Sequence, residues 1–119
     1  MDQKTKPPGS LGELENIAIR LAEIQETLTP RIRRKRVLTF AADHGVTAEG
    51  VSAYPSEVTC QMVLNFVNSG AAINVLTKEA HAELRIIDVG VDAEPFPLTP
   101  NLVNAKVRRG TRNFTKEPA

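Results

Sequence analysis

The chain has 119 residues, which is enough to bury one modest hydrophobic core. Its 15 Lys and Arg residues and 14 Asp and Glu residues leave a net charge of +1, too small for a general attraction to nucleic acid or acidic membranes. The lone cysteine, Cys60, excludes an internal disulfide and any zinc site built from several cysteines. Because the chain has neither an apolar run long enough to span a bilayer nor a visible signal peptide, we expect a cytoplasmic protein that makes no contact with a membrane.

The first predicted helix extends from Leu11 to about Leu28. Ser10 and Glu13 have the spacing of a capping box, and Pro30 cannot continue a helix. Apolar residues at helical spacing form one stripe along it: Leu14, Ile17, Ala18, Leu21 and Ile24. We therefore expect an amphipathic helix whose apolar side packs against a partner.

Two apolar runs farther along the chain predict a βαβ unit. The runs are Val37–Ala42 and Leu84–Gly90, and helical patterns that start at Pro55 and at Ala71 lie between them. We expect parallel strands joined by a right-handed crossover, with the first strand covered on both faces. A third strand is predicted at Val103–Val107. Since open sheets of this kind have about five or six strands, the chain is expected to be part of a larger structure.

Candidate site residues lie where the predicted strands end. Asp43-His44-Gly45 follows the first strand directly, and Asp88 lies near the end of the second. The carboxyl ends of parallel strands form the ligand-binding edge of open α/β sheets. An imidazole beside a carboxylate can act as an acid, a base or a metal ligand. Alternatively, Asp43 braces the loop through backbone N–H groups with His44 hydrogen-bonded beside it, and from these residues alone we favour this structural role.

Two other chemistries have weak signals. The positions of His44, Cys60, His81 and Asp88 match no known pattern of metal ligands, so we expect no metal. The run Arg31–Arg36 contains five cations, but one tyrosine and no tryptophan leave little for stacking on nucleotides. A solvated loop is the favoured interpretation of this run, and no nucleic-acid partner is expected.

Several longer strings, in order along the whole chain, carry a more specific signal. They are Thr5-Lys6-Pro7-Pro8-Gly9-Ser10-Leu11-Gly12, Phe40-Ala41-Ala42-Asp43-His44-Gly45-Val46, Glu49-Gly50-Val51-Ser52-Ala53-Tyr54-Pro55, Gly70-Ala71-Ala72-Ile73-Asn74, Asp88-Val89-Gly90-Val91-Asp92-Ala93-Glu94-Pro95 and Arg109-Gly110-Thr111-Arg112-Asn113. Together they resemble the nicotinate-nucleotide–dimethylbenzimidazole phosphoribosyltransferases. The resemblance implies transfer of the phosphoribosyl group of nicotinate mononucleotide to 5,6-dimethylbenzimidazole, which yields α-ribazole 5′-phosphate and nicotinate in cobalamin biosynthesis.

The resemblance also implies a fold and an assembly. Members combine a Rossmann-like parallel α/β domain with a smaller helical domain, form homodimers and need no cofactor. Residues 1–30 are then an extended segment and the helix of the smaller domain, and residues 31–119 are the first part of a partial Rossmann-like α/β sheet with flanking helices. The general-base glutamate of the family is expected beyond Ala119, so this chain contains no catalytic residue of its own. We expect an N-terminal fragment that is inactive alone.

The family's base-binding stretch matches the segment from Ser52 to Met62. The resemblance assigns Tyr54, Pro55 and Met62 to the benzimidazole pocket, and Asp43, His44 and Gly45 to the shaping of its edge. Some members have serine at the position of Tyr54 and glutamine at that of Met62, so polar contacts to the base differ here. Alternatively, Tyr54 anchors its loop and Met62 is a core residue.

Two functions from other classes stay open. The first is a non-catalytic module that binds a base or a nucleotide, and the absence of the family's later part from the protein would favour it. A small nucleic-acid-binding domain is the second, and it requires binding that weakens steeply with salt.

Overall fold

The structure, a computed structural model, describes residues 4–118 of the chain. The chain divides into two compact units, Met1–Arg33 and Arg34–Ala119. Among the described residues, no helix combines the length and the apolarity that crossing a membrane requires.

The first unit is built around one helix, α1 (Glu13–Ile24), which is shorter at both ends than predicted. The predicted capping box is wrong, because the N-cap is Gly12, with φ of 53°, and it has no side-chain cap. The Glu15 carboxylate instead accepts the amide of Leu11 at 3.2 Å and the Lys6 ammonium at 2.7 Å. These bonds fix the approach to the helix, and the positive φ at Gly12 is a conformation that glycine adopts without steric cost.

The C-terminal end of α1 comes before the proline that was expected to stop it. Gln25 caps the helix, and its backbone amide donates hydrogen bonds to the carbonyls of Leu21 and Glu23. Glu26 then takes φ of 49°, a left-handed conformation that cannot continue a right-handed helix. No residue of α1 is buried, and its predicted apolar stripe is open: Leu14 is 63% exposed and Ile24 is 66% exposed.

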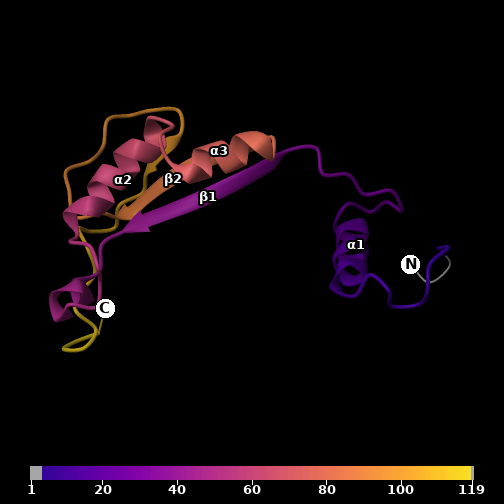
Figure 1. The fold of residues 1–119 in the computed structure, drawn as a ribbon, viewed down its shortest axis with the longest axis horizontal. Helices are drawn as coiled ribbons and strands as arrows, with labels where there is room; N and C mark the ends of the chain where they lie inside the picture. Colours follow the sequence, from indigo (N-terminus) through magenta and orange to yellow (C-terminus); the bar gives the residue numbers. More distant parts are fainter. Residues whose placement is uncertain (1–3, 119) are drawn as a thin grey trace. The chain divides into compact units, whose positions relative to one another are not determined.

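The second unit contains the predicted parallel sheet, which is confirmed (Figure 1). Its strands are β1 (Lys35–Ala42), β2 (Ala82–Gly90) and β3 (Leu102–Asn104), in the order β1-β2-β3, and both pairs are parallel. Helices α2 (Glu57–Val67) and α3 (Ala72–Glu79) lie between β1 and β2 in the chain. The third strand begins before the predicted Val103–Val107 and is shorter than it.

A small core holds the helices on one face of the sheet. Its buried members come from all three strands, from α2 and from the loop after β2: Ala41, Val63, Ile86, Val91, Phe96 and Leu102. Ala41, Ile86 and Leu102 belong to the same face because side chains alternate along a strand and these strands are in register. The alternation therefore determines which side of β1 meets α2.

The opposite face of the sheet contradicts the expectation that β1 is covered on both sides. The register places Phe40, Ile87 and Val103 in one row across the three strands. Phe40 is 62% exposed and Leu38, on the same face, is 49% exposed. Among the described residues of the second unit, no helix covers this face, because both helices of the crossover are on the other one.

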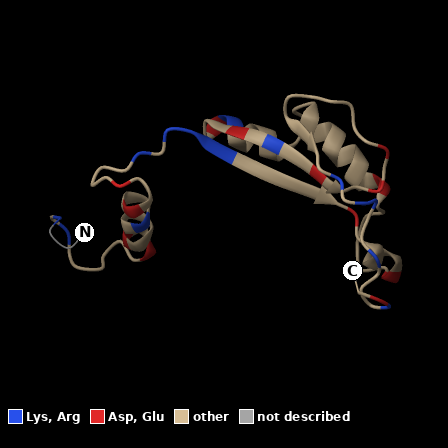
Figure 2. Ribbon diagram, turned by 180° about the vertical axis from the view of Figure 1, so that it is seen from behind, with Lys and Arg blue, Asp and Glu red and all other residues tan. Residues whose placement is uncertain are grey.

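Charged side chains gather at the start of β1, where the basic run enters the sheet (Figure 2). Arg36 donates two hydrogen bonds to the Glu83 carboxylate of β2, at 2.9 and 2.7 Å. Arg85 donates a third at 2.9 Å. The Arg85 and Arg36 guanidinium groups lower the pKa of Glu83. At least one cation of the run therefore contributes to pairing of the strands.

Candidate functional site

A cleft of about 410 Å³ opens between the carboxyl end of β1 and the first turns of α2. Its walls include most of the predicted site residues: Asp43, His44, Tyr54, Pro55 and Met62. An apolar wall comes from β1 and α2 through Ala41, Val58, Val63 and Phe66, and the hydroxyl-bearing residues Thr47, Ser52, Ser56 and Thr59 line the rest. Gly45 and Asp88, the other predicted site residues, are not part of the lining.

Tyr54 is on the loop before α2, and 71% of its surface is exposed. The Ser52 hydroxyl accepts the Tyr54 amide at 3.2 Å and donates to the Tyr54 carbonyl at 2.8 Å. These local bonds hold the backbone of the loop without using the phenol ring. The ring therefore stays available to pack on a flat aromatic ligand.

Met62 reaches the cleft from α2 and is 38% exposed, next to the fully buried Val63. The start of α2 is tied to the segment before it, because the Ser56 hydroxyl lies 3.3 Å from that of Thr47. Thr47 belongs to the 3₁₀ helix η1 (Gly45–Glu49), which lies between β1 and α2 in the chain. The thioether of Met62 gives the apolar wall a soft and adaptable surface.

Asp43 is 7% exposed and is bonded through backbone groups. Its Oδ2 accepts the Asp92 amide at 2.7 Å, its own amide donates to the Gly90 carbonyl at 3.0 Å, and its carbonyl accepts the Thr111 amide at 2.9 Å. These are the contacts that the structural alternative for Asp43 requires. They also place a charged group on the cleft wall in a fixed orientation.

His44 is exposed and contacts the segment near the end of the chain. Its Nδ1 lies 3.4 Å from the Thr111 hydroxyl, and its carbonyl accepts the Thr47 hydroxyl at 2.9 Å. Gly45 lets that segment pass close by, because a Cβ at this position would lie 2.7 Å from the Thr111 carbonyl oxygen and from the Asn113 amide nitrogen. Gly45 therefore lies next to the segment near the end of the chain and behind the cleft lining.

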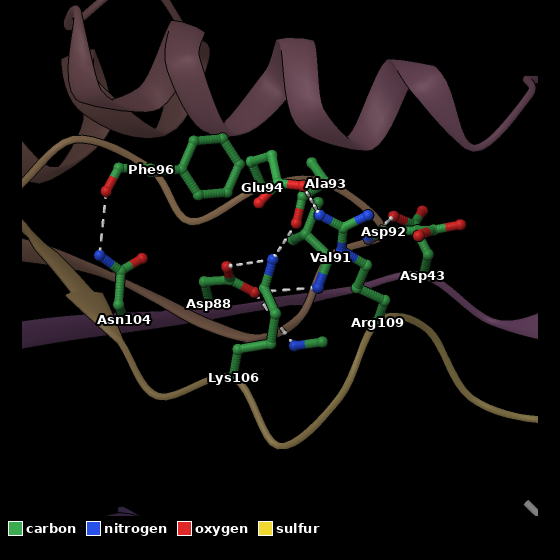
Figure 3. Close-up of polar contacts among 11 residues, drawn as sticks. Asp43, Asp88, Val91, Asp92, Ala93, Glu94, Phe96, Asn104, Lys106 and Arg109 are labelled. Atoms are coloured by element: carbon green, nitrogen blue, oxygen red, sulfur yellow. Dashed lines mark hydrogen bonds and ion pairs between the residues drawn. The ribbon is translucent and has the colours of Figure 1, made fainter.

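Asp88 reaches the carboxyl edge as expected but is not among the residues that line the cleft. Figure 3 shows it beside Lys106. It is fully buried, and its Oδ1 accepts the amides of Gly90 at 3.1 Å and Val91 at 2.9 Å. Oδ2 lies 3.2 Å from Lys106 Nζ, an ion pair whose angles fall short of a hydrogen bond. No local pattern in the sequence points to Lys106, since the pair joins the end of β2 to the segment after β3.

The other candidate ligands do not come together. Within residues 4–118, no group of three or more His, Cys, Asp or Glu side chains is arranged to hold a metal ion. Cys60 packs against the core, and His81 is in the turn between α3 and β2 with φ of 49°. The cleft by itself offers apolar contact, hydroxyl groups and one oriented carboxylate, which suits a flat aromatic ligand with few polar atoms.

Comparisons with known proteins agree along the whole chain. A family model described as "Phosphoribosyltransferase" matches residues 1–119. The nicotinate-nucleotide–dimethylbenzimidazole phosphoribosyltransferase of Geobacter sulfurreducens is 55% identical over 119 residues, and that of Chloroflexus aggregans is 51% identical over 118 residues. These alignments cover 100% and 99% of this chain, but 34% and 33% of the relatives.

A solved structure has the same fold over the same residues. The crystal structure of CobT from Thermus thermophilus is similar with a TM-score of 0.88 and 53% identity. The similarity covers 99% of this chain and 35% of that one. The chain therefore spans about a third of the length of the relatives that it matches.

Proposed function

Since the chain belongs to the phosphoribosyltransferase family, we propose that it forms the base-binding wall of an enzyme that transfers the phosphoribosyl group of nicotinate mononucleotide to 5,6-dimethylbenzimidazole. The products of this reaction are α-ribazole 5′-phosphate and nicotinate, and the product nucleotide becomes part of cobalamin. Relatives named nicotinate-nucleotide–dimethylbenzimidazole phosphoribosyltransferase are similar to this chain over 99 to 100% of its length.

One observation supports the assignment of the base to this chain: Tyr54 and Met62 line one cleft beside Asp43 and His44. A dimethylbenzimidazole is flat and largely apolar, so it matches the apolar wall of β1 and α2 and a mobile thioether. An exposed phenol ring at the rim adds a surface for stacking.

The rest of the reaction belongs to residues outside this chain. As a ring nitrogen bonds to the ribose carbon and nicotinate leaves, the benzimidazole must lose the proton of its ring N–H, and a general base accelerates that transfer. We place this base, a glutamate, beyond Ala119, together with the glycine-rich segments that hold the nucleotide phosphate. The full-length enzyme is proposed to be a cytoplasmic homodimer that needs no cofactor, with α1 in its smaller helical domain. On this proposal the 119-residue chain binds the base but does not turn it over.

The test uses Met62 as a reporter of the cleft. With ¹³C-labelled methionine methyl groups, adding 5,6-dimethylbenzimidazole to the chain is expected to shift the Met62 signal in a saturable way. The variant Met62→Leu assigns the signal. The variant Leu76→Met adds a reporter on an exposed site of α3 outside the cleft, and its signal should not move.

The outcomes separate the proposal from its alternative. A Met62 signal that stays unmoved at millimolar base would contradict the proposal. A shift with nicotinate mononucleotide but not with the base would favour a nucleotide-binding module. When the chain is mixed with both substrates, chromatography is expected to detect no α-ribazole 5′-phosphate. Detection of this product would mean that the general-base residue lies within this chain.

A further inference from the structure

Lys106 lies outside the cleft, yet its ammonium group is held at the edge of the sheet from which the cleft opens (Figure 3). The side chain is 15% exposed. Nζ lies 3.2 Å from Asp88 Oδ2, donates to the Ala93 carbonyl at 2.5 Å, and lies 5.9 Å from the centre of the Phe96 ring. A charge that has lost most of its water must be compensated by such partners, so its place is closely determined.

A short path of bonds leads from Lys106 to the cleft. Lys106 holds the carbonyl of Ala93, and the residue before it, Asp92, donates its amide to Asp43 Oδ2 at 2.7 Å. The other end of the same turn is held by Asp88, whose Oδ1 accepts two successive amides. The Asp88–Lys106 pair thus holds both ends of the turn that presents its amide to Asp43.

We propose that Lys106 is a positioning residue for base binding: by pinning Ala93, it keeps the Asp92 amide on Asp43 and so fixes the shape and charge of the cleft wall. This inference rests on the proposed function, because the cleft is taken to hold the base. Lys106 is not among the residues that line the cleft.

The physical reason lies in the buried carboxylate of Asp43. A carboxylate has about four acceptor sites, and the Asp92 amide is the hydrogen-bond donor that fixes the orientation of this one. If the turn moves, Asp43 loses that donor, and the charged group must rotate or draw in water to compensate. Either response changes the volume and polarity of the wall next to the base.

The variant Lys106→Met tests the inference, with Lys78→Met as the matched control. Met keeps the apolar stem of the side chain on Phe96 but removes the charge and the donor. We expect affinity for 5,6-dimethylbenzimidazole, measured from the Met62 methyl signal, to fall about 3- to 10-fold, the range for losing one buried hydrogen bond. Hydrogen exchange at the Asp92 amide should accelerate as well. Lys78 is exposed on α3, and its variant should change neither quantity.

A second pair of variants separates positioning from loss of stability. If Lys106→Met fails to fold, Asp88→Asn combined with Lys106→Met removes both charges and keeps the acceptor for the two amides. Its affinity should fall by the same 3- to 10-fold. Ile86→Val, in the core, should lower the melting temperature without changing the affinity, because Ile86 is not on the path from Lys106 to Asp43.

Two results would overturn the inference. One is a folded Lys106 variant that keeps wild-type affinity for the base, and the other is wild-type exchange at the Asp92 amide. If the wild-type chain does not bind the base at all, the proposed function fails. Exchange at Asp92 in the Lys106 variants then still decides whether Lys106 controls the turn.

Discussion

Asp43 directly follows β1 and Asp88 lies near the end of the neighbouring parallel strand β2, yet different partners compensate their burial. Asp43 accepts a backbone amide on the cleft wall, whereas Asp88 combines two backbone amides with the Lys106 ammonium. Both sites avoid the cost of an unpaired buried charge. The predicted strand ends correctly placed the two carboxylates at one edge of the sheet. The partner of Asp88, Lys106, comes from a segment after β3 that reaches this edge only when the chain folds.

Tyr54 gives the most direct prediction at the residue scale. In the full-length enzyme, Tyr54→Ala should raise the KM for 5,6-dimethylbenzimidazole about 3- to 10-fold, because an aromatic contact of the usual strength is lost. The KM for nicotinate mononucleotide should change less. Val51→Ala is the control, since Val51 is 67% exposed in the same loop and does not line the cleft. Equal changes in both KM values would remove Tyr54 from the base pocket.

Gly45 leads to a prediction about stability. Gly45→Ala should cost about 3 kcal/mol, the upper end of overpacking, because its Cβ would lie 2.7 Å from backbone atoms of Thr111 and Asn113. Gly50→Ala has open space around its Cβ but φ of 70°, so it should cost only about 1 kcal/mol. Urea unfolding of both variants measures the difference, and similar losses would show that the close approach at Gly45 is relaxed.

At the scale of elements, the 3₁₀ helix η1 is joined to the last described segment through Glu49. The carboxylate accepts Asn113 Nδ2 at 2.7 Å and lies 3.1 Å from Lys116 Nζ. Lys116 and then Asn113 lower the pKa of Glu49. The contact joins the segment that passes behind Gly45 to the element that lines the cleft through Thr47.

The sign of the pH dependence follows from the lowered pKa. Ionised Glu49 stabilises the contact at any pH above the pKa that this group has in the unfolded chain, and the contribution is lost as the pH falls through the lower folded-state pKa. The Thr115 amide donates to Asn113 Oδ1 at 3.1 Å, and its protection factor, the exchange rate of an unfolded chain at the same pH divided by its own, should therefore fall on acidification. Glu49→Gln should remove this dependence, while Glu79→Gln, on the exposed side of α3, should preserve it. An unchanged profile in Glu49→Gln would assign the effect to another carboxylate.

The two faces of β1 show what apolar periodicity predicts and what it leaves open. The apolar run of β1 predicted a strand covered on both faces, yet one face is open among the described residues of the second unit. Apolar residues on both faces say that both sides of a parallel sheet need cover, but they do not say which segment supplies it. The predicted capping box is wrong for a different reason. Gly12, with its positive φ, is the N-cap, so Ser10 lies outside the helix.

At the scale of the molecule, the two units differ in how much they bury. The second has a core around Ile86 and Val63, whereas no residue of α1 is buried. A helix of 12 residues is marginal in water without packing. In the 119-residue chain, amides of α1 should therefore exchange much faster than those at the centre of β2. Equal protection would mean that α1 folds cooperatively with the sheet.

The sequence by itself determined the α/β class, the parallel βαβ order and the family, because these depend on periodicity and on strings of residues that are local in the chain. It also pointed to Asp43 and to the segment from Tyr54 to Met62. Only the tertiary structure brought these residues to one cleft, left Leu38 and Phe40 exposed on one face of the sheet and paired Lys106 with Asp88. Such contacts join residues far apart in the chain, and their energy depends on burial and geometry that arise when the segments pack.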